Sequence, residues 1–416
     1  MSSQNLTRYI LIGLVLGLLT GWAINANFAP DVAKELAGYL SIITDVFLRL
    51  IKMIIAPLVL ATLTIGVAHM GEGTVGRTFT RTLAWFITAS IVSLGLGIAM
   101  VNLLAPGSGL GLPLPLEAAD AGIATKAFNL KDFIAHIFPK SIIEAMATNE
   151  VLQIVVFSLF AGVAMIKLGD KAAPIARGLD ALMEVMLVIT GYVMRVAPFA
   201  VFAAIASSIA VEGLGILITY GKFVGGFYLA LAVLWALLLG AGSAVLGFAE
   251  VKRLLPQIRE PFLITFATAS SEAAYPKLLS ALERHGVPNR IASFVLPLGY
   301  SFNLDGSMMY CAFASLFIAQ AYGIDLSLGQ ELALLGLLMI TSKGIAGVPR
   351  ASLVVIAAAL PYFHIPEAGL LLVLAVDHFL DMGRSATNVI GNAVATAVIA
   401  KWDAGDQAKL DAAAKI

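Results

Sequence analysis

Long apolar runs are the feature that most constrains how this chain folds. A helix needs about 20 apolar residues to cross the hydrocarbon core of a bilayer. Eight runs approach or exceed this length, near residues 8–27, 39–70, 80–104, 150–168, 179–211, 216–248, 291–322 and 366–400. Only 12% of the 416 residues are charged, whereas soluble domains carry about 25%. We therefore predict an all-α polytopic membrane protein, which argues against a soluble enzyme.

The charges show no imbalance that would attract nucleic acid. Lys and Arg together number 26, as do Asp and Glu, so no net field draws polyanions to the chain. The single cysteine, Cys311, cannot form an internal disulfide. The first run follows one basic residue, Arg8, and lacks a small-residue cleavage site, so we expect a first spanning helix rather than a signal peptide.

Two further apolar stretches, about 255–283 and 328–362, are interrupted at their middles by small and polar residues. Residues 268–272 read T-A-S-S-E, and residues 342–349 read S-K-G-I-A-G-V-P. At about 1.5 Å per residue, each half is too short to span a bilayer comfortably. Paired broken segments at corresponding positions are typical of a transporter binding site near the midplane.

The charges that flank these stretches indicate where they enter the membrane. Positive charge collects on the cytoplasmic side, and Arg259, Arg284 and Arg290 flank the first stretch. Acidic residues, including Glu331 and Glu367, flank the second. We therefore predict eight crossings plus two re-entrant helical hairpins from opposite faces, with both termini cytoplasmic. Two kinked core helices are the alternative.

The last apolar run carries a narrow polar stripe. Its polar residues include Asp377, Asp381, Arg384, Ser385, Asn388 and Asn392. These six fall within an arc of about 100° on a helical wheel. Inserting an ionised side chain costs about 2.5–3.5 kcal/mol, so these groups face protein, water or a ligand. They either tie this helix to its neighbours as an Asp–Arg–Asp cluster or leave the guanidinium open to a substrate carboxylate.

The hairpin tips and the polar stripe together suit an acidic substrate. Helix N-termini at the tips offer free N–H groups to a carboxylate, and Ser270 and Ser271 add hydroxyls. Arg384 would bind a second carboxylate with two hydrogen bonds, and Asp381 would bind an ammonium group. With this aspartate the site fits an acidic amino acid, and without it a C4-dicarboxylate.

The seventh apolar run contains a polar interruption, S-F-N-L-D-G-S at residues 301–307. Asn303, Asp305 and Gly306 would break an apolar helix and expose carbonyl and carboxylate oxygens. Oxygen ligands suit a small hard cation such as Na⁺. A buried, hydrogen-bonded kink is the alternative, and no spacing rule separates the two.

These motifs resemble those of the dicarboxylate/amino acid:cation symporter family, the glutamate transporter homologues. The resemblance covers nearly the whole chain and rests on the serine-rich hairpin tip, N-L-D-G at 303–306, A-G-V-P at 346–349 and D-M-G-R with a following asparagine at 381–388. It implies the glutamate-transporter-like inverted-repeat fold. It also implies a homotrimer that works by an elevator mechanism in the cell inner (plasma) membrane.

The resemblance also implies how the chain divides. Residues 1–78 (helices one and two) and 105–212 (a loop, then helices four and five) would form a scaffold. Residues 79–104 (helix three) and 213–402 (helix six, the first hairpin, helix seven, the second hairpin and helix eight) would form a moving transport domain. Residues 403–416 would be a cytoplasmic tail, and the second hairpin would be the extracellular gate.

Site residues carry over by position from the family. Ser271 and the Val348 backbone resemble substrate contacts of the hairpin tips, Asp381 the amino-group ligand and Arg384 the ligand of the side-chain carboxylate. Further polar substrate contacts would be Ser307, Ser385 and Asn388. Three sodium sites would follow: backbone at Gly299 and Asn303 with Asn388 and Asn392; backbone at Ser301, Ser342, Lys343 and Ile345; and Asn303, Asp305 and Ser90.

Several positions depart from the family pattern and bear on ion coupling. Asn392 stands where sodium-driven members carry aspartate, and Ala89 stands where a threonine hydroxyl is expected, so cation binding would be weaker. Cys311 stands where animal carriers have a protonatable glutamate. Glu272 at the first tip is then either a proton carrier or a solvated or capping side chain. We expect Na⁺, H⁺ or both to drive transport, with no other cofactor.

The retained Asp381 favours a glutamate or aspartate symporter, with a C4-dicarboxylate symporter as the alternative. An intramembrane enzyme is disfavoured, because no histidine has metal-ligand spacing and Ser342 and Lys343 make a poor dyad. A passive anion channel could use the same polar groups. The expected partners are a small acidic substrate, cations, membrane lipid and further copies of the chain, and no nucleic acid.

Overall fold

The protein is all-helical wherever its structure is described. The computed structural model describes residues 3–68, 72–108, 135, 137–213, 220–342, 351–374 and 376–413, and these residues form helices and short connections without a strand. Six helical segments among them are long and apolar enough to cross a membrane. The predicted all-α membrane class is therefore confirmed, while the count of eight crossings stays a prediction.

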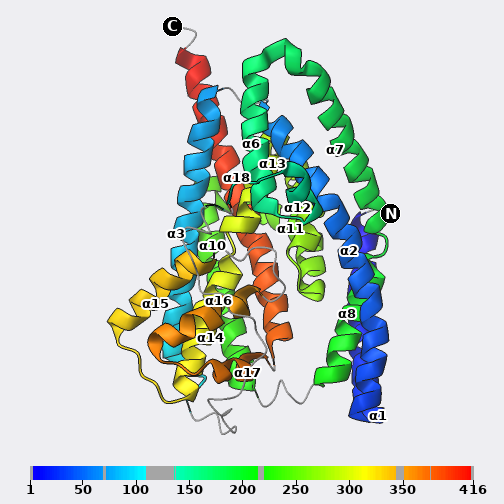
Figure 1. The fold of residues 1–416 in the computed structure, drawn as a ribbon, viewed down its shortest axis with the longest axis vertical. Coiled ribbons are helices and arrows are strands. Elements are labelled where there is room, and N and C mark those ends of the chain that lie inside the picture. The colour runs from blue at the N-terminus through cyan, green and yellow to red at the C-terminus, as the bar shows by residue number, and fades with distance from the viewer. Residues whose placement is uncertain are drawn as a thin grey trace.

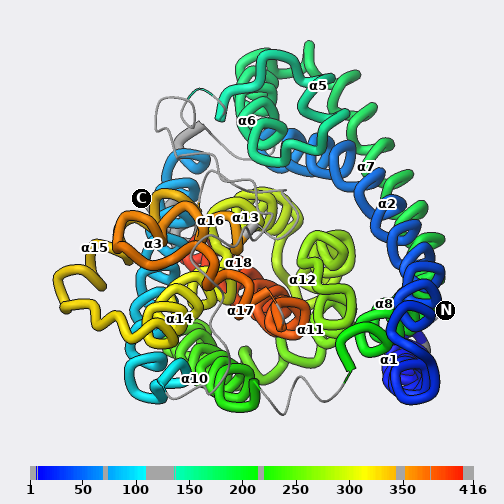
Figure 2. Tube along the Cα trace, turned by 60° about the horizontal axis from the view of Figure 1, so that its bottom comes forward, coloured from blue at the N-terminus to red at the C-terminus, as the bar shows by residue number. Residues whose placement is uncertain are grey.

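One group of helices forms an arc around the rest of the molecule (Figure 2). It comprises α1 (Ser3–Asn27), α2 (Pro30–Ala68), α5 (Ile142–Ala147), α6 (Val151–Leu168), α7 (Ala173–Val193) and α8 (Ala197–Glu212), with the short 3₁₀ helix η1 (Gly169–Ala172) between α6 and α7. In this group α1 lies along α8, and α2 packs against α6, α7 and α8.

Small residues let α1 and α8 approach closely. A side chain at Gly17 would place its Cβ 2.6 Å from the Phe202 carbonyl oxygen, and one at Gly21 would meet the Ala206 oxygen at the same distance. Gly13 makes a similar approach to Pro198. Glycines spaced by four residues line one face of a helix, and such faces are typical of tight helix contacts inside membranes. The pair α1 and α8 is therefore a close-packed unit.

The second group of helices surrounds the last long helix. Its elements are α3 (Glu72–Leu104), α10 (Gly221–Leu246), α11 (Phe248–Thr268), η2 (Glu272–Ala274), α12 (Tyr275–His285), α13 (Asn289–Phe302), α14 (Asp305–Ala321), α15 (Leu328–Thr341), α16 (Ala351–Ala359), η4 (Leu360–Phe363), η5 (Glu367–Gly369), α17 (Leu370–Leu374) and α18 (Asp377–Ala413). Helices α10, α11, α13 and α14 all contact α18, which makes α18 the centre of this group (Figure 1).

Helix pairs occupy both stretches in which the sequence predicts hairpins. Helices α11 and α12 contact each other, and Ala269 ends α11 in the left-handed conformation with φ +50°. Helices α15 and α16 also contact each other, and residues 343–350 between them lie outside the described part. The first arm begins at Phe248, earlier than the predicted boundary at 255. Entry of each pair from a single membrane face stays a prediction.

Three predicted spans contain breaks. The seventh predicted span (291–322) is interrupted between α13 and α14 at Asn303 and Leu304, as the sequence predicts. Span five divides at residues 194–196, where Pro198 occupies the first turn of α8 and disfavours a continuous helix through the residues before it. Span eight divides into α17 and α18, and Asp377 begins α18, where an acidic side chain is favoured by the helix dipole.

Candidate functional site

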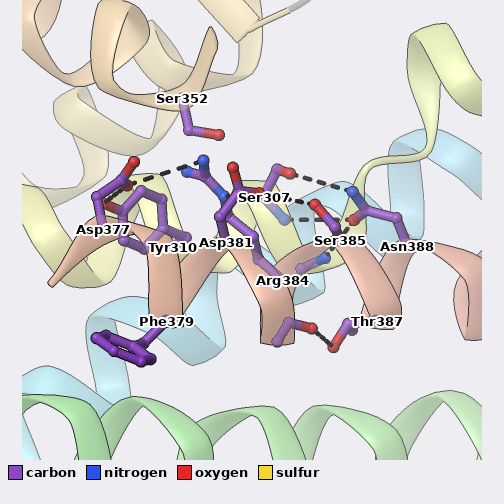
Figure 3. A network of polar contacts seen from close by, with 12 residues as sticks. Ser307, Tyr310, Ser352, Asp377, Phe379, Asp381, Arg384, Ser385, Thr387 and Asn388 are labelled. Carbon is purple, nitrogen blue, oxygen red and sulfur yellow. Dashed lines mark hydrogen bonds and ion pairs between the residues drawn. The ribbon is translucent and has the colours of Figure 1, made fainter. Parts of the chain in front are cut away.

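Hydrogen bonds and an ion pair connect the charged residues on the polar face of α18. Asp381 Oδ1 accepts hydrogen bonds from Arg384 Nε at 2.9 Å and from Ser385 Oγ at 2.7 Å (Figure 3). These partners lie three and four residues further along the helix, the spacing at which side chains on one face meet. Asp381, Arg384 and Ser385 of the predicted stripe are therefore joined by hydrogen bonds.

The Arg384 guanidinium is buried, with its side chain 3% exposed. Its Nη2 lies 3.8 Å from Asp377 Oδ1, and Tyr310 donates a hydrogen bond of 2.7 Å to that same oxygen. The guanidinium carbon also sits 4.4 Å from the centre of the Tyr310 ring. The arrangement matches the Asp–Arg–Asp cluster that the sequence suggests, with a tyrosine added.

One nitrogen of this guanidinium, Nη1, is buried and has no hydrogen-bond partner among the described residues. A buried donor without an acceptor costs roughly 1–3 kcal/mol, so such a position calls for a partner such as a water, an ion or a ligand. Asp381 beside it is 21% exposed at its side chain. The cluster therefore offers one open cationic donor next to one accessible carboxylate.

Helix α10 fixes the orientation of α18. Trp235 Nε1 donates to Thr387 Oγ1 at 2.7 Å, and Tyr228 donates through its hydroxyl to the Phe379 carbonyl oxygen at 2.7 Å. Thr387 and Phe379 lie on the opposite side of α18 from Asn388 and Asp377 in Figure 3. Because these bonds hold the rear of the helix, the charged residues are presented toward α14 and α16.

Asn388 joins α18 to the start of α14. Its Oδ1 accepts from the backbone N–H of Gly306 at 2.9 Å and of Ser307 at 3.4 Å, while its Nδ2 donates to Ser307 Oγ at 3.1 Å. A side chain at Gly306 would collide with the carbonyl oxygen of Arg384. The predicted site residues Ser307 and Asn388 are thus brought together, whereas Ser385 bonds Asp381. Asn388 also satisfies orphan amides of a helix N-terminus.

A second polar cluster lies one turn further along α18, where the α13–α14 break meets it. Asn303 Nδ2 donates to Asp305 Oδ2 at 3.2 Å and to Asn392 Oδ1 at 3.1 Å. From α3, Ser93 donates to Asp305 Oδ1 at 3.4 Å and Ser90 donates to the Phe302 carbonyl oxygen at 3.4 Å. The structure therefore places Ser90, Asn303, Asp305 and Asn392, which the resemblance assigns to two sodium sites, in one neighbourhood. Their role as cation ligands stays a prediction.

This second cluster is crowded with oxygen atoms. Asn303 Oδ1 is buried without a hydrogen-bond partner among the described residues. A side chain at Gly391 would collide with Asp305 Oδ2, and one at Gly299 would collide with Asn392 Oδ1. No group of three His, Cys, Asp or Glu side chains in the described part suits a transition metal. Amide, hydroxyl and carboxylate oxygens are instead the ligands of a small hard cation.

The predicted gate sodium site is only partly within the described residues. Ser301 and Ser342 are both buried, and the Ser301 hydroxyl has no hydrogen-bond partner among the described residues. Ser342 donates to the Met339 carbonyl oxygen at 3.2 Å. Lys343 and Ile345, and the predicted substrate contact Val348, lie outside the described residues.

The tip of the first helix pair lies beside α18 and α2. Ala269 packs on the apolar cluster that contains Phe379 and Met382, which brings the tip close to the turn that carries Asp381. Ser270 and Ser271 are partly buried, and neither hydroxyl bonds another described residue. Glu272 begins η2, which contacts α2, the helix that carries Lys52.

Sequence reasoning missed three of the groups that shape the site, namely Tyr310, Ser93 and Trp235. Each lies on a helix that reads as apolar core, and each acts on a partner far away in the chain. One available signal is that a buried tyrosine or tryptophan needs a partner for its polar atom.

An all-helical, apolar chain with a buried charged cluster and an adjacent oxygen-rich cluster defines an integral membrane transport protein. The profile of the sodium:dicarboxylate symporter family matches residues 6–402. The chain belongs to this family. It is therefore a transporter and not an enzyme, and it works with coupling ions instead of a cofactor.

Curated relatives align with the chain over almost its full length. A proton/sodium-glutamate symport protein of Bacillus caldotenax is 36% identical over 410 residues, which cover 97% of this chain and 96% of the relative. A C4-dicarboxylate transport protein of Deinococcus deserti is 39% identical over 404 residues, covering 96% and 89%. A proton/sodium-glutamate symport protein of Bacillus subtilis is 36% identical over 407 residues, covering 96% and 92%.

Proposed function

We propose that the chain is a secondary active symporter that imports glutamate or aspartate together with Na⁺, H⁺ or both. The observation that carries this proposal is the buried Arg384 guanidinium, whose Nη1 lacks a partner among the described residues while the Asp381 carboxylate beside it stays accessible. The open N–H groups suit a side-chain carboxylate. The accessible aspartate suits the substrate ammonium.

Asp381 is the residue that favours an amino acid over a C4-dicarboxylate. The relatives named above include transporters of both kinds, so their names do not choose between the two. Succinate carries no cation to balance the Asp381 charge, whereas glutamate and aspartate do. The C4-dicarboxylate symporter remains the second candidate because Arg384 alone suits any carboxylate.

The remaining predicted ligands would complete the site around Arg384. Ser270, Ser271 and the Val348 backbone would bind the α-carboxylate at the hairpin tips, and Ser307 and Ser385 would add polar contacts. The packing of Ala269 on the apolar cluster of Ile205, Ile209, Phe379 and Met382 supports the placement of the first tip. Asn388 would serve both substrate and cation, because it links α18 to the start of α14.

Cations would bind where α18 meets the α13–α14 break. The proposed ligands are Ser90, Asn303, Asp305, Asn392 and the Gly299 backbone, with a gate site at Ser301, Ser342, Lys343 and Ile345. The unpartnered buried oxygens of Asn303 and Ser301 support this assignment. Asp305 is the only carboxylate among Ser90, Asn303, Asp305, Asn392 and the Gly299 backbone. Cation binding is therefore weaker than it would be with an aspartate at position 392. Glu272 is the proposed proton carrier.

The two helix groups support an elevator mechanism. The arc would be the scaffold, covering residues 1–78 and 105–212, and the group around α18 would be the transport domain, covering 79–104 and 213–402. The close α1–α8 contact through Gly13, Gly17 and Gly21 supports a rigid scaffold. We place both termini in the cytoplasm and the chain, as a homotrimer, in the cell inner (plasma) membrane.

Uptake into proteoliposomes tests this proposal. Labelled aspartate, glutamate and succinate would be offered separately under an imposed Na⁺ gradient, an imposed H⁺ gradient or neither. We expect aspartate or glutamate to accumulate above its outside concentration under at least one gradient and not without one. Accumulation of succinate alone would establish the second candidate. Equilibration to the outside concentration under every gradient would show a passive channel and contradict symport.

A further inference from the structure

Two cavities lie between the arc and the central group, and each is walled by both. The first, about 180 Å³, is lined by Leu6 of α1, by Tyr192 and Arg195 at the end of α7, and by Lys277 of α12. We call it the basic cavity.

The second cavity measures about 190 Å³ and has an apolar lining. Leu14 and Leu18 of α1 and Ile205 of α8 form its wall on the arc, and Phe266 of α11 and Phe379 of α18 form its wall on the central group. We call it the apolar cavity. Its position between two separate helix groups means that neither group alone fills it.

Helix α1 lines both cavities, so its residues indicate how deep each cavity lies in the membrane. Its apolar span runs over Arg8–Asn27, so Leu6 lies just before the span. Leu14 and Leu18 lie inside the span, about 9 and 15 Å beyond Arg8 at the usual helical rise. Figure 1 shows the N-terminus next to the end of α7. Leu6 lies just before the Arg8–Asn27 span, and Tyr192 and Arg195 lie at the end of the Val151–Val193 span, so we place the basic cavity at the ends of these spans and the apolar cavity within the α1 span. This placement takes the division of the predicted 179–211 span at residues 194–196 as a span end.

The basic cavity also differs from the apolar cavity in that two cationic side chains, Lys277 and Arg195, line it. Lys277 Nζ is paired with Glu260 Oε1 at 2.9 Å. Arg195 is exposed, its guanidinium carbon lies 5.7 Å from the Tyr192 ring centre, and no carboxylate in the described part of the chain forms an ion pair with it. Arg195 thus supplies a positive charge that no carboxylate among the described residues pairs with. A forked guanidinium at this place suits a phosphate.

We propose that the two cavities together bind one anionic phospholipid. Its phosphate lies at Arg195 and Lys277, and one acyl chain enters the apolar cavity between Leu18 and Phe379. A soluble anion would match only the basic cavity, and a neutral hydrophobic molecule only the apolar one. A lipid matches both, because its charge and its hydrocarbon are separated along the membrane normal as the cavities are. The bound lipid joins the arc to the central group.

Native mass spectrometry of the purified full-length protein tests the proposal. The delipidated protein would be titrated with phosphatidylglycerol and with phosphatidylcholine of the same acyl chains. We expect one phosphatidylglycerol per chain to bind in preference to phosphatidylcholine. Arg195→Gln should weaken phosphatidylglycerol binding about fivefold and abolish the preference. Arg177→Gln, on α7 but outside both cavities, is the matched control and should change nothing.

Filling the apolar cavity tests the acyl-chain part separately. Leu18→Trp on α1 and Ser208→Leu on α8 should each weaken the binding of both lipids. Two variants are used so that a folding defect in one of them does not decide the result. Equal binding of the two lipids, or unchanged phosphatidylglycerol binding in Arg195→Gln, would overturn the headgroup assignment. Unchanged lipid binding in both filling variants, or displacement of the lipid by inorganic phosphate, would overturn the assignment of a lipid. The basic cavity would then be a site for a soluble anion. None of these readouts requires transport.

Discussion

At the scale of single residues, Arg384 and Asp381 have separable roles in the proposed site. Asp381→Ser removes the proposed partner of the substrate ammonium together with the acceptor of the Arg384 Nε bond, while the Arg384–Asp377 pair remains to hold the guanidinium. We expect aspartate affinity to fall by at least about 30-fold, the usual effect of truncating one member of a desolvated charge pair. Succinate, which has no ammonium, should still bind. Calorimetric titration of the purified protein with each ligand measures both, and unchanged aspartate affinity would remove Asp381 from the assignment.

Gly391 tests the proposed cation cluster. A methyl group at this position would collide with Asp305 Oδ2, so Gly391→Ala should displace the only carboxylate of that cluster. We expect the half-maximal concentration of the driving cation in substrate-binding assays to rise by about tenfold or more. Gly240→Ala on α10 is the matched control, because a methyl there meets open space. Equal cation dependence in the two variants would show that Asp305 does not bind the cation.

At the scale of elements, the close approach of α1 and α8 predicts a sharp packing response. Gly17→Val places a branched side chain against the Phe202 carbonyl, which a Cβ would already meet at 2.6 Å. Overpacking of this kind costs about 1–3 kcal/mol. The midpoint of thermal unfolding in detergent should therefore fall. Gly38→Val in α2, where a Cβ would have open space, controls for helix propensity, and identical midpoints would refute the contact.

Periodicity and charge predicted most of the elements but not all of their breaks. The interruption at Asn303 and Asp305 was predictable because polar residues and a glycine stand inside an apolar run. The division of span five near Pro198 was missed although proline carries a local signal. The break before Asp377 was missed because residues 370–401 read as one continuous amphipathic helix. The length of an apolar run indicates where a span lies but not where the helix within it breaks.

The site was predictable on α18 and less so around it. Asp377, Asp381, Arg384 and Ser385 share one helix face, so spacing alone brought them together. Tyr310 reaches Asp377 from 67 positions away in the chain, and a local pattern carries no information about such a contact. The proposed ligands at 343, 345 and 348 lie outside the described residues and stay predictions.

At the scale of the whole molecule, the apolar cluster of Ile205, Ile209, Phe379 and Met382 joins the two helix groups. If the group around α18 moves against the arc, a covalent link across this cluster should stop transport and spare binding. In a Cys311→Ser background, Ile209→Cys with Phe379→Cys would be joined by a bifunctional thiol reagent. We expect uptake to fall to background while calorimetry still detects substrate.

A link within the arc is the control for that experiment. Leu14→Cys with Ile205→Cys joins α1 to α8, which already pack as one unit, so the same reagent should leave uptake unchanged. Continued uptake after complete cross-linking of the Ile209–Phe379 pair would contradict a relative movement of the two groups.

The central claim is that the open nitrogen of the buried Arg384 guanidinium binds a substrate carboxylate. Arg384→Lys tests it most directly, because lysine keeps the positive charge between Asp377 and Asp381 and removes the fork that bonds Asp381 and a ligand together. Isothermal titration of aspartate into the wild-type and variant proteins, with equal unfolding midpoints as proof of folding, is the measurement. We expect aspartate to bind the variant at least about 30-fold more weakly, and equal affinity would show that the guanidinium does not bind the substrate carboxylate.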